Sequence, residues 1–250
     1  MKILYAGTAP KDFNFPESNE DTYALDQQTH RFALSDGASE SFDSKLWAKI
    51  LADKFIQNPA LDESWLADGI QIYSTKHDFP SMSWSKQASF ERGSFATLIG
   101  VEYFPVHQSV DVLCVGDSLA VFIDELSYID SFSYTHAFKF KERPELLSTS
   151  ASHNQFLYTA DFFATHHKTW SFAGRKSPKL LCMTDALGEW ALKCAEEDDP
   201  QWEFLCSISN DLQLAKLVRD ARDQKQMRID DSTLMHFDLA GIEADELSQP

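Results

Sequence analysis

The chain has 250 residues, of which 43% are hydrophobic and 24% charged, and its formal net charge is −17. This length suffices for one large domain with a sizeable apolar core, or for two small domains at most. The strong negative charge argues against a general binder of nucleic acid or of anionic membranes, because both of these partners are polyanions.

Nothing in the sequence predicts insertion into a membrane or export. No apolar run approaches the roughly 20 residues that a membrane-spanning helix needs, and the apolar start is too short for a signal peptide. The four cysteines form no C-x-x-C pair, and two of them lie in apolar runs, where a free thiol packs as a small hydrophobic group. We therefore expect a cytoplasmic protein without disulfides.

The first half of the chain contains strand patterns and helix patterns. Residues 1–7 are predicted to form an edge strand. Further apolar runs predict strands over residues 22–27, 31–36, 95–103 and 110–124. Apolar residues recur at helical spacing in 43–57 and 63–75, and Asp43 or Ser44 would cap the first of these helices.

The second half is less regular at its start. Residues 125–178 carry scattered aromatic, His, Ser and Thr residues, and we predict short strands and loops there. Further on, strands are predicted over 180–184 and 232–239, and helices over 186–197, from Pro200, and over 212–221. Strand groups separated by helices favour an α+β protein with antiparallel sheets. Residues 1–240 would form a single domain, followed by an acidic flexible tail over 241–250.

Acidic residues stand at the ends of several strand-like runs. Asp36, Asp117 and Asp185 each follow an apolar run, whereas Asp21 and Asp230 precede one. Strand ends lie at the rim of a sheet, so these carboxylates can converge on one site. Carboxylates that crowd together repel one another unless a cation neutralises them. Their hard oxygen atoms suit Mg²⁺, Mn²⁺ or Ca²⁺ rather than zinc.

Six short segments around these acids follow one another between residue 19 and about residue 239. They are 19–21, 32–37, 93–97, 115–118, 184–186 and 230–233. Each is common when taken alone, but the ordered set resembles the metal-dependent Ser/Thr protein phosphatases of type 2C, the PPM family, in a bacterial form. The resemblance implies an α+β fold of two packed antiparallel β-sheets flanked by helix pairs.

The resemblance also implies a metal centre at one edge of the sheets. Asp36 would bridge two ions, and the backbone carbonyl of Gly37 would bind one of them. Asp185 and Asp230 would complete the protein ligands of the first ion.

Three other acids would act around these ligands. Glu20 and Asp21 would hold metal-bound waters, and Asp117 would form a third, weaker metal site together with Asp185. On this scheme the catalytic residues are Asp21, Asp36, Asp185 and Asp230.

The implied reaction is hydrolysis of phosphoserine or phosphothreonine on a protein partner, such as a Ser/Thr kinase or its target. Two Mn²⁺ or Mg²⁺ ions, with a third as an open alternative, would lower the pKa of a bridging water so that hydroxide attacks phosphorus. The ions would also offset the charge on the phosphoryl oxygens. No nucleic acid and no membrane is expected as a partner.

Four positions depart from the family pattern. Pro16 stands where a phosphate-binding arginine is usual, and Arg31 and Arg92 are candidates to replace that arginine from elsewhere in space. The other three departures are Ala38 for a histidine, Ala186 for a glycine and Glu189 for an aspartate. These changes bear on rate and phosphopeptide affinity more than on metal binding.

Other interpretations stay open at this point. The chain could be an inactive pseudophosphatase that serves as a binding module, or a metal-dependent hydrolase of a small phosphoester. Asp36 and Gly37 could form only a turn after a strand. Asp117 could lie in a hairpin turn or accept a buried hydrogen bond, and Asp231 could make a local hydrogen bond rather than bind metal.

Overall fold

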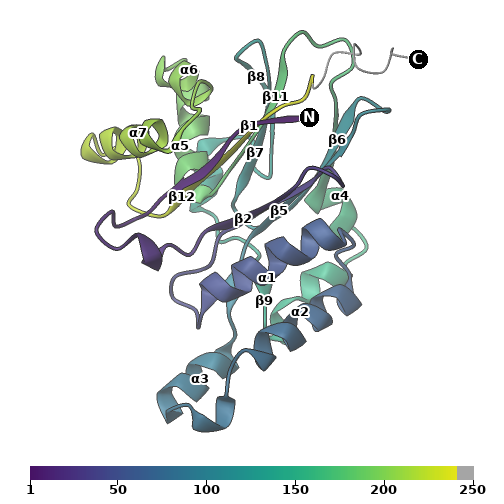
Figure 1. Cartoon of the computed structure of the whole chain (residues 1–250), viewed down its shortest axis with the longest axis vertical. Helices are drawn as coiled ribbons and strands as arrows, with labels where there is room; N and C mark the ends of the chain where they lie inside the picture. The colour runs from purple at the N-terminus through teal and green to yellow at the C-terminus, as the bar shows by residue number, and fades with distance from the viewer. Residues whose placement is uncertain (241–250) are drawn as a thin grey trace.

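Two five-stranded antiparallel sheets lie face to face in the computed structural model, which describes residues 1–240 (Figure 1). The first sheet has the strand order β1-β12-β11-β7-β8, and the second has the order β10-β6-β5-β3-β2. The expected α+β architecture of two packed antiparallel sheets is therefore confirmed. The predicted acidic tail over 241–250 lies outside the described residues.

The strands are short, as is usual for packed sheets. Those of the first sheet are β1 (Lys2–Ala9), β7 (Leu119–Asp124), β8 (Ser127–Phe132), β11 (Pro178–Met183) and β12 (Ser232–Asp238). Those of the second sheet are β2 (Thr22–Asp26), β3 (Arg31–Ser35), β5 (Leu98–Phe104), β6 (Ser109–Val115) and β10 (His167–Ser171). A separate two-stranded ladder joins β4 (Phe95–Ala96) to β9 (Leu147–Ser148).

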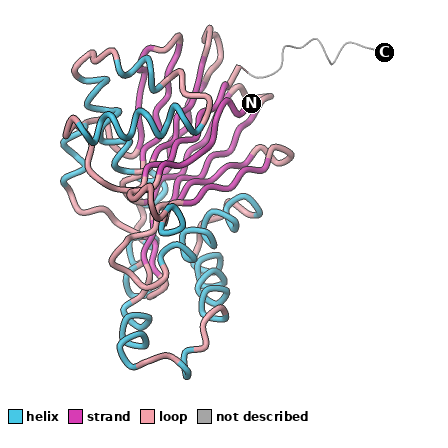
Figure 2. The backbone as a smooth tube through the Cα atoms, turned by 60° about the vertical axis from the view of Figure 1, so that its left-hand side comes forward, coloured by secondary structure: helices cyan, strands magenta, loops and turns pink. Residues whose placement is uncertain are grey.

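Helices lie on the outer faces of the sandwich, and Figure 2 shows them on both sides of the strands. The second sheet is covered by α1 (Ser44–Gln57) and α2 (Glu63–Thr75), and the first by α5 (Asp185–Glu196), α6 (Gln201–Leu205) and α7 (Asp211–Asp223). Two further helices are α3 (Trp84–Arg92), which projects at the bottom of Figure 1, and α4 (Phe162–His166).

The apolar side chains form three layers that follow the alternation of the strands. Phe32 and Leu34 of β3 point into the layer between the two sheets, whereas Ala33 packs beneath α1. Successive strand residues face opposite sides of a sheet, so one strand supplies both layers. Both sheets are thus buried on both faces, and the strand ends and loops at the rim remain available for polar chemistry.

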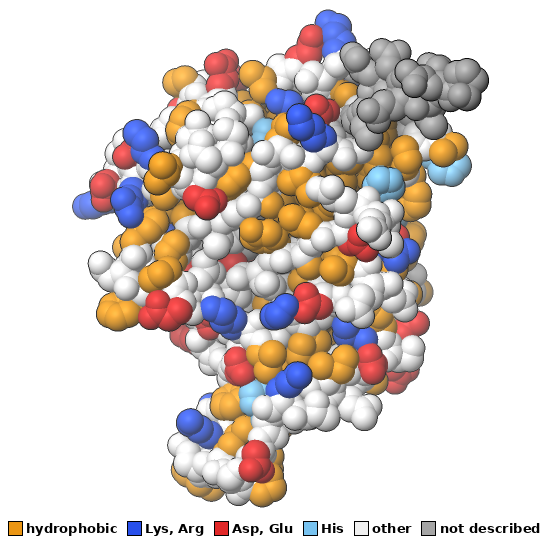
Figure 3. Space-filling view, in the orientation of Figure 1, with side chains coloured by type: hydrophobic (Ala, Val, Ile, Leu, Met, Phe, Trp, Pro, Cys, Tyr) orange, Lys and Arg blue, Asp and Glu red, His pale blue; other side chains and the backbone are white. Residues whose placement is uncertain are grey.

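The edge strands β1 and β2 leave the middle layer partly open. Ile3, Ala6, Tyr23 and Leu25 are only partly buried there, and hydrophobic side chains crowd the centre of the face in Figure 3, with charged groups around them. The Tyr23 hydroxyl donates a hydrogen bond of 3.2 Å to the Ala6 carbonyl and so links the two sheets.

Most predicted elements lie within a few residues of the observed ones, and residues 1–7 belong to an edge strand as expected. The sequence did not predict α3, because this helix buries no residue and so has no apolar face to detect. The region 125–178 contains β8, β9 and β10 as short strands, but it also contains α4 and several single turns of 3₁₀ helix. Such turns are too short to show a periodicity.

Three smaller expectations are also settled. The side chain of Asp43 makes no capping hydrogen bond to α1, so its predicted capping role is wrong; its backbone is left-handed, with φ of 46°. All four cysteines are buried free thiols, as predicted. Within residues 1–240, no helix combines the length and the apolar character needed to cross a membrane.

Gly100 on β5 allows α1 to pack closely on the second sheet. A Cβ atom at Gly100 would lie 2.1 Å from Cε2 of Phe55, a buried residue of α1. The strand cannot retreat, since β3 and β6 pair with β5 on both sides. We predict that Gly100→Ala lowers the free energy of unfolding by about 1–3 kcal/mol, measured by urea denaturation.

The matched control is the double variant Gly100→Ala/Phe55→Leu. The smaller leucine leaves room for the added methyl group, so the two substitutions should cost less together than the sum of their separate costs. Strictly additive costs would show that the contact between Gly100 and Phe55 does not limit packing.

Candidate metal centre

The ends of the strands bring the predicted acids to one rim of the sandwich. Asp36 follows β3, Asp117 lies in the turn between β6 and β7, and Asp185 is the first residue of α5. Asp21 precedes β2, and Asp230 lies shortly before β12. All four of the other acids are near enough to Asp36 to raise its pKa. The structure therefore brings together five carboxylates that are far apart in the sequence.

Asp36 lies at the centre of this repulsion. Burial raises the pKa of Asp36 well above its usual range, and the charges of Asp21, Asp185, Asp117 and Asp230 raise it further, in that order. Burial and like charge both disfavour an ionised carboxylate unless a cation lies beside it. The position of Asp36 thus favours a bound cation.

The loop after β3 holds Asp36 and Gly37 against neighbouring elements. The Asp36 amide donates to Oγ1 of Thr97 at 3.0 Å, and the Thr97 amide donates to the Asp36 carbonyl at 2.9 Å. Gly37 pairs with Ala96, and a Cβ on Gly37 would lie 2.8 Å from the carbonyl oxygen of Ser44 in α1. Only glycine fits here without moving the loop, so its backbone stays close to the acids.

Asp21 is buried and only half satisfied. Its Oδ2 atom accepts hydrogen bonds from the hydroxyls of Thr184 at 2.9 Å and Thr233 at 2.7 Å. Its Oδ1 atom is buried without a hydrogen-bond partner among the described residues. Burial raises the pKa of Asp21 to about 7, and the charges of Asp231 and Asp185 add to this effect. An unpaired buried carboxylate oxygen is a natural ligand for a metal ion or its bound water.

Glu20 faces the same rim but already has cationic and hydroxyl partners. Its Oε2 atom accepts from Nζ of Lys11 at 2.9 Å and from the Ser39 hydroxyl, while Oε1 accepts from the Ser44 hydroxyl at 2.5 Å. Burial alone would raise the pKa of Glu20, but these hydrogen bonds and Lys11 outweigh it and the pKa is lowered. Glu20 is therefore ionised and firmly positioned.

The side chain of Asp231 accepts two hydrogen bonds from backbone amides, but the expectation that they would be local is wrong, because both partners are distant in sequence. Its Oδ1 accepts from the Lys11 amide at 2.6 Å, and its Oδ2 accepts from the Glu20 amide at 2.9 Å. Asp231 thus fixes the segment between β1 and β2 that presents Lys11, Glu20 and Asp21.

An arginine that the sequence did not single out lies among the acids. The Arg228 guanidinium forms an ion pair with Oδ2 of Asp185. Burial and the charge of Asp117 raise the pKa of Asp185, Arg228 lowers it, and the net result is a pKa of about 7. Burial also raises the pKa of Asp117, against the attraction of Arg228. Arg228 follows α7 in a stretch with no regular pattern, and so no periodicity predicted its place.

The five acids have the oxygen ligands that a hard divalent cation prefers, but their side chains do not converge closely enough to coordinate one ion. Within residues 1–240, no three His, Cys, Asp or Glu side chains form a group that could hold an ion as they stand. Like charges keep the carboxylates apart, and Asp185 is turned to Arg228. The chemistry of the side chains nevertheless suits such a cation, because each of the five acids offers oxygen ligands and Oδ1 of Asp21 has no hydrogen-bond partner among the described residues.

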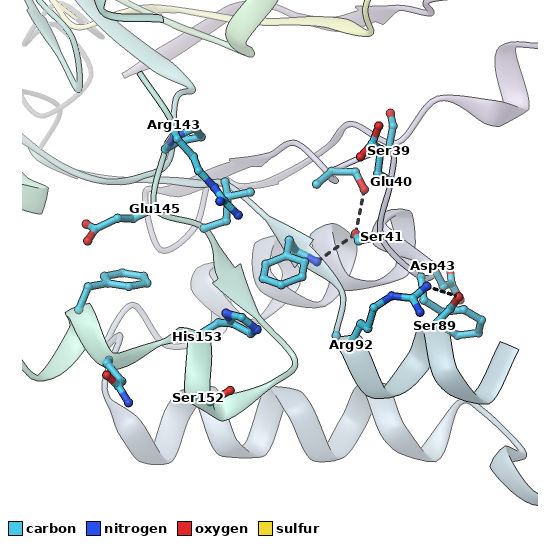
Figure 4. A pocket seen from close by; sticks show the side chains of 18 residues that line it. Ser39, Glu40, Ser41, Asp43, Ser89, Arg92, Arg143, Glu145, Ser152 and His153 are labelled. Atoms are coloured by element: carbon cyan, nitrogen blue, oxygen red, sulfur yellow. Dashed lines mark hydrogen bonds between the residues drawn. The ribbon is translucent and has the colours of Figure 1, made fainter. Parts of the chain in front are cut away.

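A pocket of about 860 Å³ opens beside this centre. Ala38 and Ser39, directly after Gly37, line one side of it, and Figure 4 shows Arg92 and Arg143 approaching from opposite sides. Arg92 donates to the Ser89 hydroxyl at 2.7 Å. Neither arginine forms an ion pair with any residue in the described part of the chain.

The structure also locates the candidates for the missing arginine. Pro16 begins a turn of 3₁₀ helix. Arg31 pairs with Glu102 at 3.2 Å and donates to the Gln57 carbonyl at 3.3 Å, so it is held along the second sheet. Arg31 is therefore not the replacement. Arg92 lines the pocket, and Lys11 is a cation at the acids that the sequence did not point to.

Comparisons with known proteins place this geometry in a known fold. No protein-family model matches the chain, and no curated protein matches it in sequence. Solved structures do match it. The PPM Ser-Thr phosphatase MsPP from Mycobacterium smegmatis is 18% identical with a TM-score of 0.51, and the match covers 94% of this chain and 98% of that one. The chain has the PPM phosphatase fold.

Two other structures agree on the PPM fold. The photosystem II phosphatase PBCP is 13% identical with a TM-score of 0.58, covering 94% of this chain and 97% of that one. The Mycobacterium tuberculosis serine/threonine phosphatase PstP/Ppp is 14% identical with a TM-score of 0.54, covering 93% and 96%. The resemblance seen in the sequence is thus confirmed for the fold.

The raised pKa values of the carboxyl groups at this rim predict how the stability of the protein depends on pH. A carboxyl whose pKa is raised by folding stabilises the protein at low pH, and this stabilisation is lost as pH rises through the folded pKa. For Asp21 and Asp185 the loss falls between about pH 4 and pH 7. We predict that protein in EDTA melts at a lower temperature at pH 8 than at pH 6, by differential scanning fluorimetry.

Asp36→Asn is the matched variant, since it removes one charge and keeps the shape. It should stabilise the metal-free protein at pH 8 by ~0.5–2 kcal/mol and should abolish the rise in melting temperature that Mn²⁺ gives the wild type. A variant that is less stable than the wild type in EDTA at pH 8 would contradict the repulsion described here.

Proposed function

We propose that this protein is a Mn²⁺- or Mg²⁺-dependent phosphatase that hydrolyses phosphoserine or phosphothreonine on a protein substrate. The observation that carries the proposal is the convergence of four acids on Asp36 in a PPM fold. A site with this much uncompensated negative charge is suited to bind divalent cations, and such cations bind phosphoryl oxygens.

The proposed roles follow the positions of the acids. Asp36 would bridge two ions, the Gly37 carbonyl would bind one of them, and Asp185 and Asp230 would complete the protein ligands of the first ion. The bound ions would supply a hydroxide nucleophile near neutral pH and electrostatic stabilisation of the phosphoryl group.

The surrounding residues would position water and maintain the shape of the centre. The free Oδ1 of Asp21 is placed to accept a hydrogen bond from a metal-bound water. Glu20 is ionised and could orient a second such water, although Lys11, Ser39 and Ser44 already donate to it. The threonines that donate to Asp21 keep its carboxylate in one orientation.

Lys11 is the proposed replacement for the missing phosphate-binding arginine. Its Nζ atom lies 2.9 Å from Oε2 of Glu20 and 2.9 Å from Oγ of Ser39, and Ser39 lines the large pocket. The ammonium group therefore stands between the acids and the space that a substrate would enter. It can contact a phosphoryl oxygen as a point charge, without the two parallel hydrogen bonds of a guanidinium.

The large pocket is the proposed binding place for the protein part of the substrate. Arg92 and Arg143 line it together with Glu40, Asp43 and Glu145, so its walls carry charges of both signs. The two arginines form no ion pair among the described residues and would contact acidic groups of the substrate. The partner would be a phosphoprotein, such as a Ser/Thr kinase or its target, in the cytoplasm. Neither nucleic acid nor a membrane is proposed as a partner.

Two observations favour a second candidate function. Asp185, a proposed ligand, is already paired with Arg228, and Ala38 stands where the family usually has a histidine. A protein with a weakened centre could serve as a binding module for phosphoproteins. Turnover measurements separate this candidate from the phosphatase, and a panel of small phosphoesters tests the remaining alternative substrate class.

We predict that the purified protein hydrolyses p-nitrophenyl phosphate with Mn²⁺ and not with excess EDTA. Asp36→Ala and Asp230→Ala should each lower kcat/KM by ~10²-fold or more, because each removes a metal ligand. Asp53→Ala is the control, since Asp53 is a surface residue of α1 paired with Lys49. Full activity of the Asp36→Ala variant would contradict the proposed metal-dependent mechanism.

A second prediction separates phosphate binding from peptide binding. Lys11→Ala should lower kcat/KM about 10-fold on both p-nitrophenyl phosphate and a phosphopeptide, since both carry the phosphoryl group. Arg143→Ala should raise KM for the phosphopeptide by about the same factor and leave the small substrate unchanged. Lys45→Ala, which removes a lysine that contacts the Glu17 carbonyl, serves as the control. An equal effect of Arg143→Ala on both substrates would contradict this division.

A further inference from the structure

The guanidinium of Arg228 is surrounded by carboxylates. It is ion-paired with Asp185, whose side chain is 14% exposed, while the side chain of Arg228 itself is 38% exposed. Burial works against the charge of Arg228, but attraction to Asp185, Asp117 and Glu189 prevails and raises its pKa. Arg228 therefore stays protonated between three acids at all ordinary pH values.

The segment that carries Arg228 is fixed by several contacts. The amides of Gln226 and Met227 both donate to the Ala221 carbonyl at the end of α7, at 2.9 and 3.2 Å. Met227 is buried, and Arg222 donates to the Asp230 carbonyl beyond it. These contacts fix the backbone of the turn that carries Arg228 beside the acids.

Glu189 and Arg228 line the same hollow of about 370 Å³ beside the start of α5. Asp185, the first residue of that helix, forms an ion pair with Arg228, and Asp117, in the turn between β6 and β7, is near enough to Arg228 to raise its pKa. The acids around this point are Asp117, Asp185 and Glu189, which are the oxygen donors that an additional divalent ion beside the two-ion centre would require.

We propose that the Arg228 guanidinium takes the place of a third metal ion at Asp117, Asp185 and Glu189, so that the centre loads two divalent ions instead of three. This inference rests on the proposed metal-dependent function. A divalent ion at the same point would face a permanent positive charge and would have to displace it from Asp185. A covalently attached cation cannot be diluted away, so the charge balance at Asp117 would not depend on metal concentration.

The arrangement also explains why the Asp185 carboxylate can serve two cations. Its Oδ2 pairs with Arg228, and its Oδ1 accepts the Ala186 amide. On this proposal Oδ1, which has no cationic partner, is the oxygen that would bind the first metal ion. Arg228 would therefore orient Asp185 as a ligand, which makes it a positioning residue and not a catalytic one.

The test is the number of Mn²⁺ ions bound, measured by isothermal titration calorimetry and checked by elemental analysis after equilibrium dialysis. The wild type should bind two ions, and Arg228→Met should bind a third, weaker one. Arg219→Met is the matched control, because Arg219 of α7 packs over the ring of Phe13; this variant should bind two ions. The same count for the wild type and for Arg228→Met would overturn the proposal.

A second variant keeps the question open to test if Arg228→Met fails to fold. Asp117→Asn in the otherwise unchanged protein should leave the count at two, because on this proposal Asp117 lies near the charge of Arg228 and binds no ion. A wild type that binds three ions, and an Asp117→Asn variant that binds two, would overturn the proposal and leave the proposed function standing. Binding of no Mn²⁺ by the wild type would instead contradict the metal centre, and with it the proposed function.

Discussion

Repulsion among carboxylates around Asp36 is the constraint on which the rest of the centre depends. Five acids reach one rim because the strands end there, and burial denies them the water that would weaken their mutual repulsion. The sandwich tolerates this arrangement because each sheet is buried on both faces and anchors its strand ends firmly. The same repulsion that is predicted to destabilise the metal-free protein would favour the binding of divalent cations.

Cationic side chains and hydrogen bonds of the protein offset part of this repulsion. Lys11 offsets Glu20, Arg228 offsets Asp185, and threonine hydroxyls donate to Asp21. None of these partners reaches Asp36, whose side chain has no cation among the described residues. The chain therefore pairs Glu20 and Asp185 with cations and leaves Asp36 without one, so a divalent ion would relieve the most repulsion at Asp36 itself.

The sequence predicted which acids lie together at the rim, but it did not predict the cations and hydroxyl groups that contact them. Strand alternation and its interruptions located Asp36, Asp117 and Asp185, because a strand end is a local property. Thr184 and Thr233 stood inside the matched segments, beside the acids, so their role as donors to Asp21 could have been proposed. Lys11 and Arg228 could not, since each lies in an irregular segment and its place depends on long-range packing. The helix α3 was missed for a different reason, because it buries no residue and so shows no apolar periodicity.

The central claim is that divalent ions bind among these acids with Asp36 between them. Anomalous diffraction at the manganese edge, from crystals grown with Mn²⁺, tests it most directly. Two peaks are expected, one among Asp36, Asp185 and Asp230 and the other beside Asp36 and the Gly37 carbonyl. Well-diffracting crystals without a peak near Asp36 would show that no manganese ion binds there and that the proposed metal centre is wrong.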